Sequence, residues 1–249
     1  MKIKYELTNL DKLAHKYFYR GYDIMFLHGW FCAYLSAPSD SEDDCVIPSY
    51  LILNEEKIDD EKRFSKFIDE LMLLYSDLAE NIYEKNKLIK PLISLNSANN
   101  FDLTSVDDKM KINLLVWLYG YMCGYLVIGV DITEYCSDDK LLEDKFYPAL
   151  YTLCVIFLLL DQQIDVTTIF DEVAIEDYLD VKADILDLWE SVDNGPTLLD
   201  AIQQIELDAA IGELVDALNA IFYVIRVADE NRYNQDTKNN TLLNRLVMH

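Results

Sequence analysis

The sequence predicts an all-α fold, a soluble bundle of about seven or eight helices around a buried central helix at about 105–131. Apolar residues recur at the three- and four-residue spacing of one helix face along most of the chain, and strand-like alternation is nearly absent. Only seven glycines and five prolines interrupt the 249 residues, which is little punctuation for hairpins. Apolar residues make up 51% of the chain, enough for a sizeable core.

Four helices are expected in the first ninety residues, over about 8–21, 23–35, 48–53 and 60–87. Thr8 and Asp23 are suited to cap the first two, because short polar side chains accept hydrogen bonds from the free N–H groups at a helix start. Pro48 suits the first turn of the third helix, where no N–H donor is needed. Asp59 or Asp60 can cap the fourth, whose apolar residues form one stripe.

Four more helices are expected after residue 104, over about 105–131, 139–161, 171–192 and 197–231. Ser105 begins the central one, with Asp107 and Asp108 in a first turn that favours negative charge. Residues 91–103 are rich in Ser and Asn and form the clearest linker, so a single helical domain over 1–232 has a division near 91–104 as its alternative. The polar C-terminal tail over 233–249 is expected to fray.

Two apolar runs, 112–130 and 146–160, make a membrane hairpin an alternative to a soluble bundle. The first run has the length of a bilayer span. The second is short and contains Pro148, and the segment between the runs carries both signs of charge without a cluster of Lys or Arg. We therefore expect no membrane insertion and interpret both runs as helices surrounded by neighbours in a soluble core.

The charge and the cysteines of the chain restrict its class. Lys and Arg total 21 against 45 Asp and Glu, and the net charge of −24 argues against direct binding of nucleic acid. Five cysteines without metal-ligand spacing and a polar N-terminus predict free thiols in a cytoplasmic protein. The sequence has no Gly-rich phosphate loop, no G-x-S-x-G elbow and no Glu-x-x-His pair, so no catalytic residue, no metal ligand and no cofactor is predicted.

Carboxylates are concentrated in residues 161–225, which carry sixteen of them and one base, Lys182. Four follow the spacing of one helix face, namely Asp177, Asp180, Asp184 and Asp187. A solvated face is one interpretation of this stripe. A docking surface for a basic protein and an imitation of the phosphate spacing of DNA are the two others.

Small residues and a histidine are the remaining candidates. Gly120 and Gly124 lie one turn apart, which in lipid would form a dimerisation face and in a soluble bundle lets a second helix approach closely. We favour the soluble interpretation. His28 and Cys32, also one turn apart, are half of a metal-ligand pair, but the chain has only two other histidines, so we expect a core histidine.

Several short passages occur in the order of one family's signatures. They lie at 27–33, 48–51, 117–124 and 213–227. In this order they resemble the YecA/YgfB-like bacterial proteins, whose signature positions are matched by His28, Gly29, Trp117, Gly120 and Gly124. We interpret these five as packing residues. The chain departs from the family at Tyr50, where Trp is usual, and it lacks the cysteine-rich C-terminal zinc motif of many members, so no zinc-dependent role is carried over.

The resemblance implies an acidic, all-helical protein without established catalytic residues, of a family in which binding to regulatory proteins has been proposed for some members. With the acidic segment, it predicts a non-enzymatic adaptor or regulator that binds a basic protein partner through acidic helices. One alternative is an enzyme built from carboxylates and tyrosines, with or without a divalent metal ion between helices. The other is a DNA-mimic protein. Seventeen tyrosines and three tryptophans leave a homodimer open.

Overall fold

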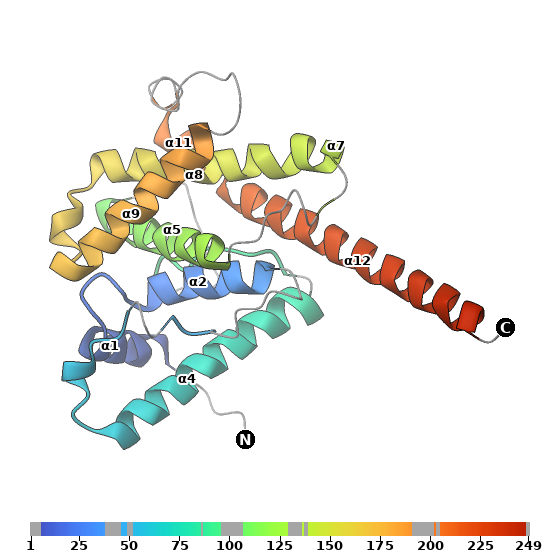
Figure 1. The fold of residues 1–249 in the computed structure, drawn as a ribbon. Coiled ribbons are helices and arrows are strands. Elements are labelled where there is room, and N and C mark those ends of the chain that lie inside the picture. The colour runs from blue at the N-terminus through green and yellow to red at the C-terminus, as the bar shows by residue number, and fades with distance from the viewer. Residues whose placement is uncertain are drawn as a thin grey trace.

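A computed structural model of the protein confirms the predicted all-α class (Figure 1). It describes residues 6–37, 46–48, 52–85, 87–95, 107–128, 136, 139–190, 202 and 205–247. Within these residues there are eight α-helices of six residues or more, a few short 3-10 and π segments, and one isolated bridge between Phe18 and Leu53. The predicted helix over 48–53 and the linker over 91–103 lie largely outside the described part.

The first two helices are α1 (Leu7–Tyr17) and α2 (Ile24–Ser36). α1 ends before the predicted Gly21 because Phe18 is extended and pairs with Leu53 in an isolated bridge. In this bridge the N–H of Tyr19 donates to the carbonyl of Ile52, and the N–H of Asn54 donates to the carbonyl of Tyr17. Gly21 itself has a φ of +106°, a backbone conformation that residues other than glycine rarely adopt. Asp23 caps α2 as predicted, since its Oδ1 accepts the N–H groups of Met25 at 2.8 Å and Phe26 at 3.1 Å.

The third long helix, α4 (Glu61–Ala79), continues into a π segment (Glu80–Glu84). Of the two caps that the sequence allows, Asp60 is the one used, because its Oδ1 accepts the N–H of Arg63 at 3.1 Å. Residues 87–95, which follow this helix, have no regular secondary structure, and hydrogen bonds join them to the C-terminal helix. The N–H of Ile89 donates to Asn219 Oδ1 at 2.9 Å, and Asn219 Nδ2 donates back to the carbonyl of Ile89 at 3.1 Å.

The predicted central helix is α5 (Asp108–Ile128), and residues 114–124 of it are buried throughout. Its start differs slightly from the prediction: the side chain of Asp107 accepts the N–H of Met110 at 2.8 Å, while Ser105 lies outside the described residues. α2 runs along one side of α5, and α8 and α9 lie on the other (Figure 1). One continuous hydrophobic core joins residues from both sides of the 91–104 segment.

The remaining helices cover α5 and extend away from it. α7 (Asp139–Leu141) and a π segment (Leu142–Phe146) lead into α8 (Tyr147–Gln163), and Pro148 occupies the first turn, where proline is tolerated. A 3-10 turn (Val166–Thr168) precedes α9 (Glu172–Glu190). The last predicted helix is split into α11 (Leu207–Gly212) and α12 (Leu214–Val247). α12 passes the expected end near residue 231, because no Gly or Pro interrupts residues 232–247.

Burial decides how the apolar runs are interpreted. Among the described residues one helix, Leu142–Gln163, is long and apolar enough to cross a membrane, and 56% of its apolar window is buried inside the protein. The other run, which begins at residue 112, lies in α5, where residues 114–124 are buried by the neighbouring helices. Apolar helices that are covered by other helices are compatible with a soluble bundle.

Candidate functional site

The helices α2 and α5 approach each other closely at three glycines. A Cβ atom added to Gly29 would lie 2.0 Å from the carbonyl oxygen of Trp117, and one added to Gly120 would lie 2.1 Å from that of Phe26. At Gly124 the added atom would meet a side chain of α2 at 2.8 Å. Heavy atoms do not approach a Cβ this closely, so the backbones can touch only because these residues are glycines. The contact is closed packing with no room for a ligand.

His28 is buried in the same contact. Its Nδ1 accepts a hydrogen bond from Trp117 Nε1 at 2.9 Å and lies 3.5 Å from Cys32 Sγ. Because Nδ1 is an acceptor, the neutral imidazole carries its proton on Nε2. Burial lowers the pKa of His28 to about 4 and raises the pKa of the Cys32 thiol, so both groups are neutral at pH 7. Within the described residues no third metal ligand joins this pair.

Three of the four predicted surface carboxylates line a groove between α5 and α9, which we call the α5–α9 groove. Its volume is about 250 Å³. The carboxylates come from α9, and the apolar part of the lining comes mainly from α5. The lining residues are Tyr119, Cys123, Leu126, Val127, Asp177, Asp180, Val181 and Asp184. The fourth predicted carboxylate, Asp187, is exposed on α9 outside the groove lining.

The carboxylates of the α5–α9 groove differ in how firmly they are held. Asp177 is half-buried and accepts a hydrogen bond from the hydroxyl of Tyr22 at 2.9 Å. The same hydroxyl lies 3.3 Å from that of Tyr119. Asp180 and Asp184 are exposed and form no hydrogen bond or ion pair with the other described residues. The groove therefore has one fixed acceptor and two charges that a cationic group can approach.

The single base of the acidic segment does not neutralise this groove. Lys182 Nζ lies 2.6 Å from Oδ2 of Asp161, which belongs to α8. The other oxygen of Asp161 accepts the hydroxyl of Tyr178 at 2.7 Å. Lys182 is thus engaged in a local ion pair with α8 and is paired with neither Asp180 nor Asp184.

The remaining polar groups of the groove favour binding over nucleophilic chemistry. Burial raises the pKa of the Cys123 thiol and of the Tyr119 hydroxyl, so both are protonated at neutral pH. A thiol attacks as its thiolate, and burial in apolar surroundings suppresses that form. The arrangement can hold a cationic group by charge and an aliphatic chain by contact.

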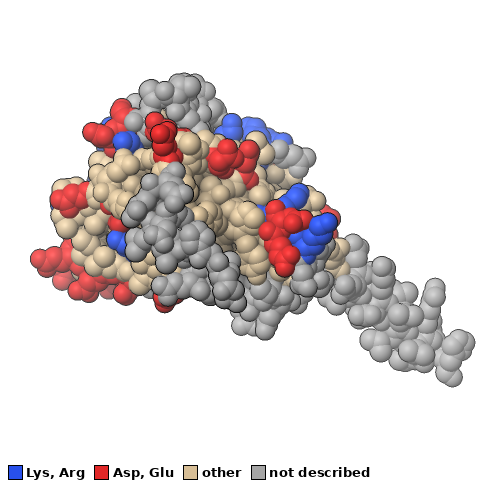
Figure 2. Space-filling model, turned by 90° about the horizontal axis from the view of Figure 1, so that it is seen from above, with Lys and Arg blue, Asp and Glu red and all other residues tan. Residues whose placement is uncertain are grey.

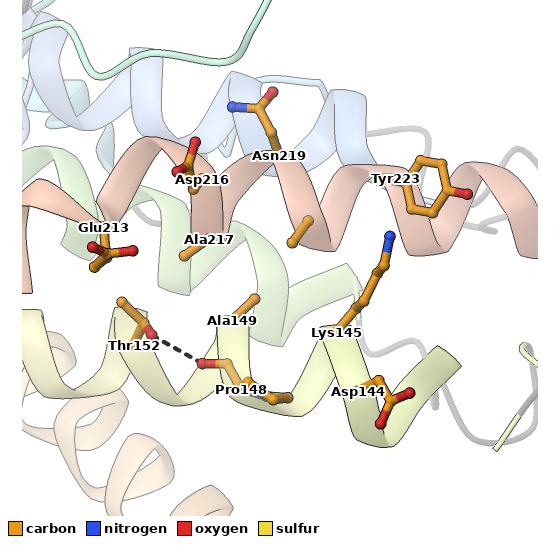
Figure 3. A pocket seen from close by; sticks show the side chains of 11 residues that line it. Asp144, Lys145, Pro148, Ala149, Thr152, Glu213, Asp216, Ala217, Asn219 and Tyr223 are labelled. Carbon is orange, nitrogen blue, oxygen red and sulfur yellow. Dashed lines mark hydrogen bonds between the residues drawn. The ribbon is translucent and has the colours of Figure 1, made fainter. Parts of the chain in front are cut away.

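A second groove, of about 480 Å³, lies between α8 and α12 (Figure 3). Its carboxylates are those of Asp144, Glu213 and Asp216. Lys145 reaches across it, with Nζ 4.5 Å from the centre of the Tyr223 ring. Because a lysine belongs to this lining, the positive charge that the groove could recruit is partly supplied already. Among the described residues that line the α5–α9 groove, none is basic.

The overall charge is distributed unevenly. Figure 2 shows Asp and Glu in several separate groups on the face seen from above, with Lys and Arg side chains among some of them. The described residues of this face do not form one continuous acidic patch. The net charge of −24 therefore does not by itself locate a binding surface, and the local arrangement around each groove has to do so.

Comparison with models of protein families, with curated proteins and with solved structures finds no match to this chain. Function is inferred here from geometry and charge.

Sequence reasoning identified the acidic side of the groove and missed its apolar side. Leu126 and Val127 lie about fifty positions before α9 in the chain, and their apolar run predicts complete burial. Val127 is instead 41% exposed. The signal available in the sequence was the position of Val127 near the end of the central helix, where coverage by neighbouring helices runs out.

Proposed function

We propose that this protein is a non-enzymatic adaptor or regulator of the cytoplasm that binds a basic protein partner in the α5–α9 groove. The observation that carries the proposal is the combination of two unpaired carboxylates, Asp180 and Asp184, with an apolar lining at Leu126 and Val127. A lysine or arginine side chain matches both parts. Its methylene groups lie on apolar surface and its charged end reaches the carboxylates.

The membership of the YecA/YgfB-like family is part of the proposal. It is supported by the position of the signature residues. His28, Gly29, Trp117, Gly120 and Gly124 all lie at the α2–α5 contact, which accounts for their small size or buried polarity without a catalytic role. In this proposal they form the scaffold that supports α9, and the carboxylates of the partner surface, which belong to α9, lie outside the signature passages.

Electrostatic attraction gives the proposal a measurable signature. Exposed charges are screened when ionic strength rises, with a Debye length of about 8 Å at physiological salt. A partner that is held by Asp180 and Asp184 is therefore released by added salt. A partner that is held by apolar contact alone is not.

The test uses a labelled helical peptide in which lysine and leucine recur at the three- and four-residue spacing of a helix face. A matched peptide has glutamate in place of lysine. Fluorescence anisotropy is measured with the full chain. We expect saturable binding of the lysine peptide only, weakened about tenfold or more in Asp180→Lys/Asp184→Lys. The control is Asp69→Lys/Asp77→Lys, which makes the same change of charge at two exposed positions of α4. Equal loss in both variants would show that only the net charge matters, and the proposed surface would be wrong.

A further inference from the structure

A cavity of about 630 Å³ lies away from the α5–α9 groove. It is bounded by α1, by the start of α2, by residues 93–95 and by the first turns of α5. Three potential metal ligands line it together, namely Asp11 and His15 of α1 and Asp23 at the start of α2. One ligand atom from each lies within 4.8 Å of the other two.

The spacing of these atoms suits a small divalent cation. Nε2 of His15 lies 3.6 Å from Oδ2 of Asp11. Two ligands at about 2.1 Å from a tetrahedral zinc ion are separated by about 3.4 Å, so this pair is already at coordinating distance. Residues four positions apart on a helix share one face, which holds both side chains on the same side of α1.

Asp23 supplies a third ligand that is partly buried and has only one of its two carboxylate oxygens engaged in hydrogen bonds. Its Oδ1 accepts the two N–H groups of the α2 cap. Its second oxygen, Oδ2, has no hydrogen-bond donor among the described residues. The carboxylate of Asp23 therefore keeps one oxygen, in the same cluster as the carboxylate of Asp11, that a cation can bind.

We propose that Asp11, His15 and Asp23 form a binding site for one divalent transition-metal ion of the zinc type. Imidazole nitrogen combined with carboxylate oxygen is a ligand set that suits such ions better than magnesium or calcium, which prefer oxygen alone. Three protein ligands leave a coordination position open toward the cavity, where Asn113 and Lys109 also line the wall. This site is independent of the proposed partner groove.

The test measures binding of Zn²⁺ to the metal-free full chain by isothermal titration calorimetry, with Mg²⁺ as the comparison ion. We expect one Zn²⁺ per chain and at least tenfold tighter binding than for Mg²⁺. His15→Gln, Asp11→Asn and Asp23→Asn should each weaken Zn²⁺ binding at least tenfold. Asn caps helices as well as Asp does, so Asp23→Asn removes the charge while keeping the start of α2 intact.

Two controls separate this site from general attraction of cations to an acidic protein. Asp69→Asn removes an exposed carboxylate of α4 and should leave Zn²⁺ binding unchanged. Co²⁺ bound at the site should give a visible absorption spectrum that disappears in His15→Gln. Absence of saturable Zn²⁺ binding, or binding that the three substitutions do not change, would overturn the proposal.

Discussion

The two long sides of α5 differ in what they can do. Toward α2 the helix presents Gly120 and Gly124, and the backbones meet so closely that a single added carbon atom cannot fit. Toward α9 it presents Leu126 and Val127 beside exposed carboxylates, and a groove remains open. The first side fixes the scaffold by excluding everything else. The second side is the one that can bind a partner, because Asp180 and Asp184 are unpaired and the apolar surface beside them is accessible.

The largest effect is expected when a methyl group is added to the side of α5 that packs against α2. Gly120→Ala is expected to destabilise the fold by about 3 kcal/mol, because the helices must separate to admit it, and Gly120→Leu by more. The matched control is Gly212→Ala, where an added Cβ has no heavy atom within 4 Å. Thermal and urea unfolding measure both variants. Equal stability of Gly120→Ala and wild type would remove the claim of a backbone contact.

The buried histidine of the packed side should make stability depend on pH. The pKa of His28 is about 4 in the folded protein against 6.5 as its ordinary value, so below pH 6.5 the unfolded chain takes up a proton that the folded chain does not. Stability should fall as pH is lowered from 6.5 to 4, by about 3 kcal/mol from this group.

His28→Asn isolates this contribution, because Asn offers an acceptor near the position of Nδ1 but does not titrate. The difference in unfolding free energy between wild type and variant is measured by urea denaturation at several pH values. This difference should shrink or reverse below pH 6.5. Other groups with a shifted pKa, such as Asp23, act in both proteins and cancel. A difference that stays constant from pH 7 to pH 4 would show that His28 is not held neutral.

A smaller effect is expected where the two sides are linked. Tyr22 of the packed region donates its hydroxyl hydrogen to Asp177 of the groove. Tyr22→Phe should cost about 1–2 kcal/mol, since a hydrogen bond to a charged group is lost at a partly buried place. Tyr223→Phe serves as the control because Tyr223 is 49% exposed. If both variants unfold at the same urea concentration, the hydrogen bond contributes nothing to the position of α9.

The smallest effect on stability belongs to the groove itself. Asp180 and Asp184 are like charges one turn apart, so Asp180→Asn/Asp184→Asn should raise the unfolding free energy by a few tenths of a kcal/mol. The same change should weaken binding of the lysine peptide. Thermal unfolding and anisotropy on one preparation compare the two. A clear loss of stability would mean that these carboxylates support the fold and are not kept for a partner.

The sequence predicted the all-α class and several helix ends, but the predicted cap at Thr8 was wrong, because α1 begins at Leu7 and Glu6 precedes it without a side-chain cap. The caps at Asp23 and Asp60 were predicted because capping depends only on neighbouring residues. The break at Glu213 and the π segments before α8 and after α4 were not, since they depend on how helices pack rather than on local propensity. α12 extends beyond the expected end near residue 231, since residues 232–247 are mostly polar but contain neither Gly nor Pro.

The candidate sites were predictable only where their residues share one helix. Three of the four carboxylates of the predicted α9 stripe line one groove, but the hydrogen bond from Tyr22 to Asp177 joins residues 155 positions apart. Asp11 and His15 have a spacing that the sequence does show, and their significance depends on Asp23, which a turn of the chain brings beside them. Such proximity follows from the tertiary fold and has no local signal.

The most direct test of the comparison is to map the lysine peptide on the two sides of α5. Amide chemical shifts of the ¹⁵N-labelled protein are recorded while the peptide is added. We predict progressive shifts at residues 177–184 of α9 and at 126–127 of α5, with residues 26–33 of α2 unchanged, and loss of the shifts in Asp180→Lys/Asp184→Lys. Shifts centred on the α8–α12 groove, or spread evenly over the acidic surface, would contradict the account.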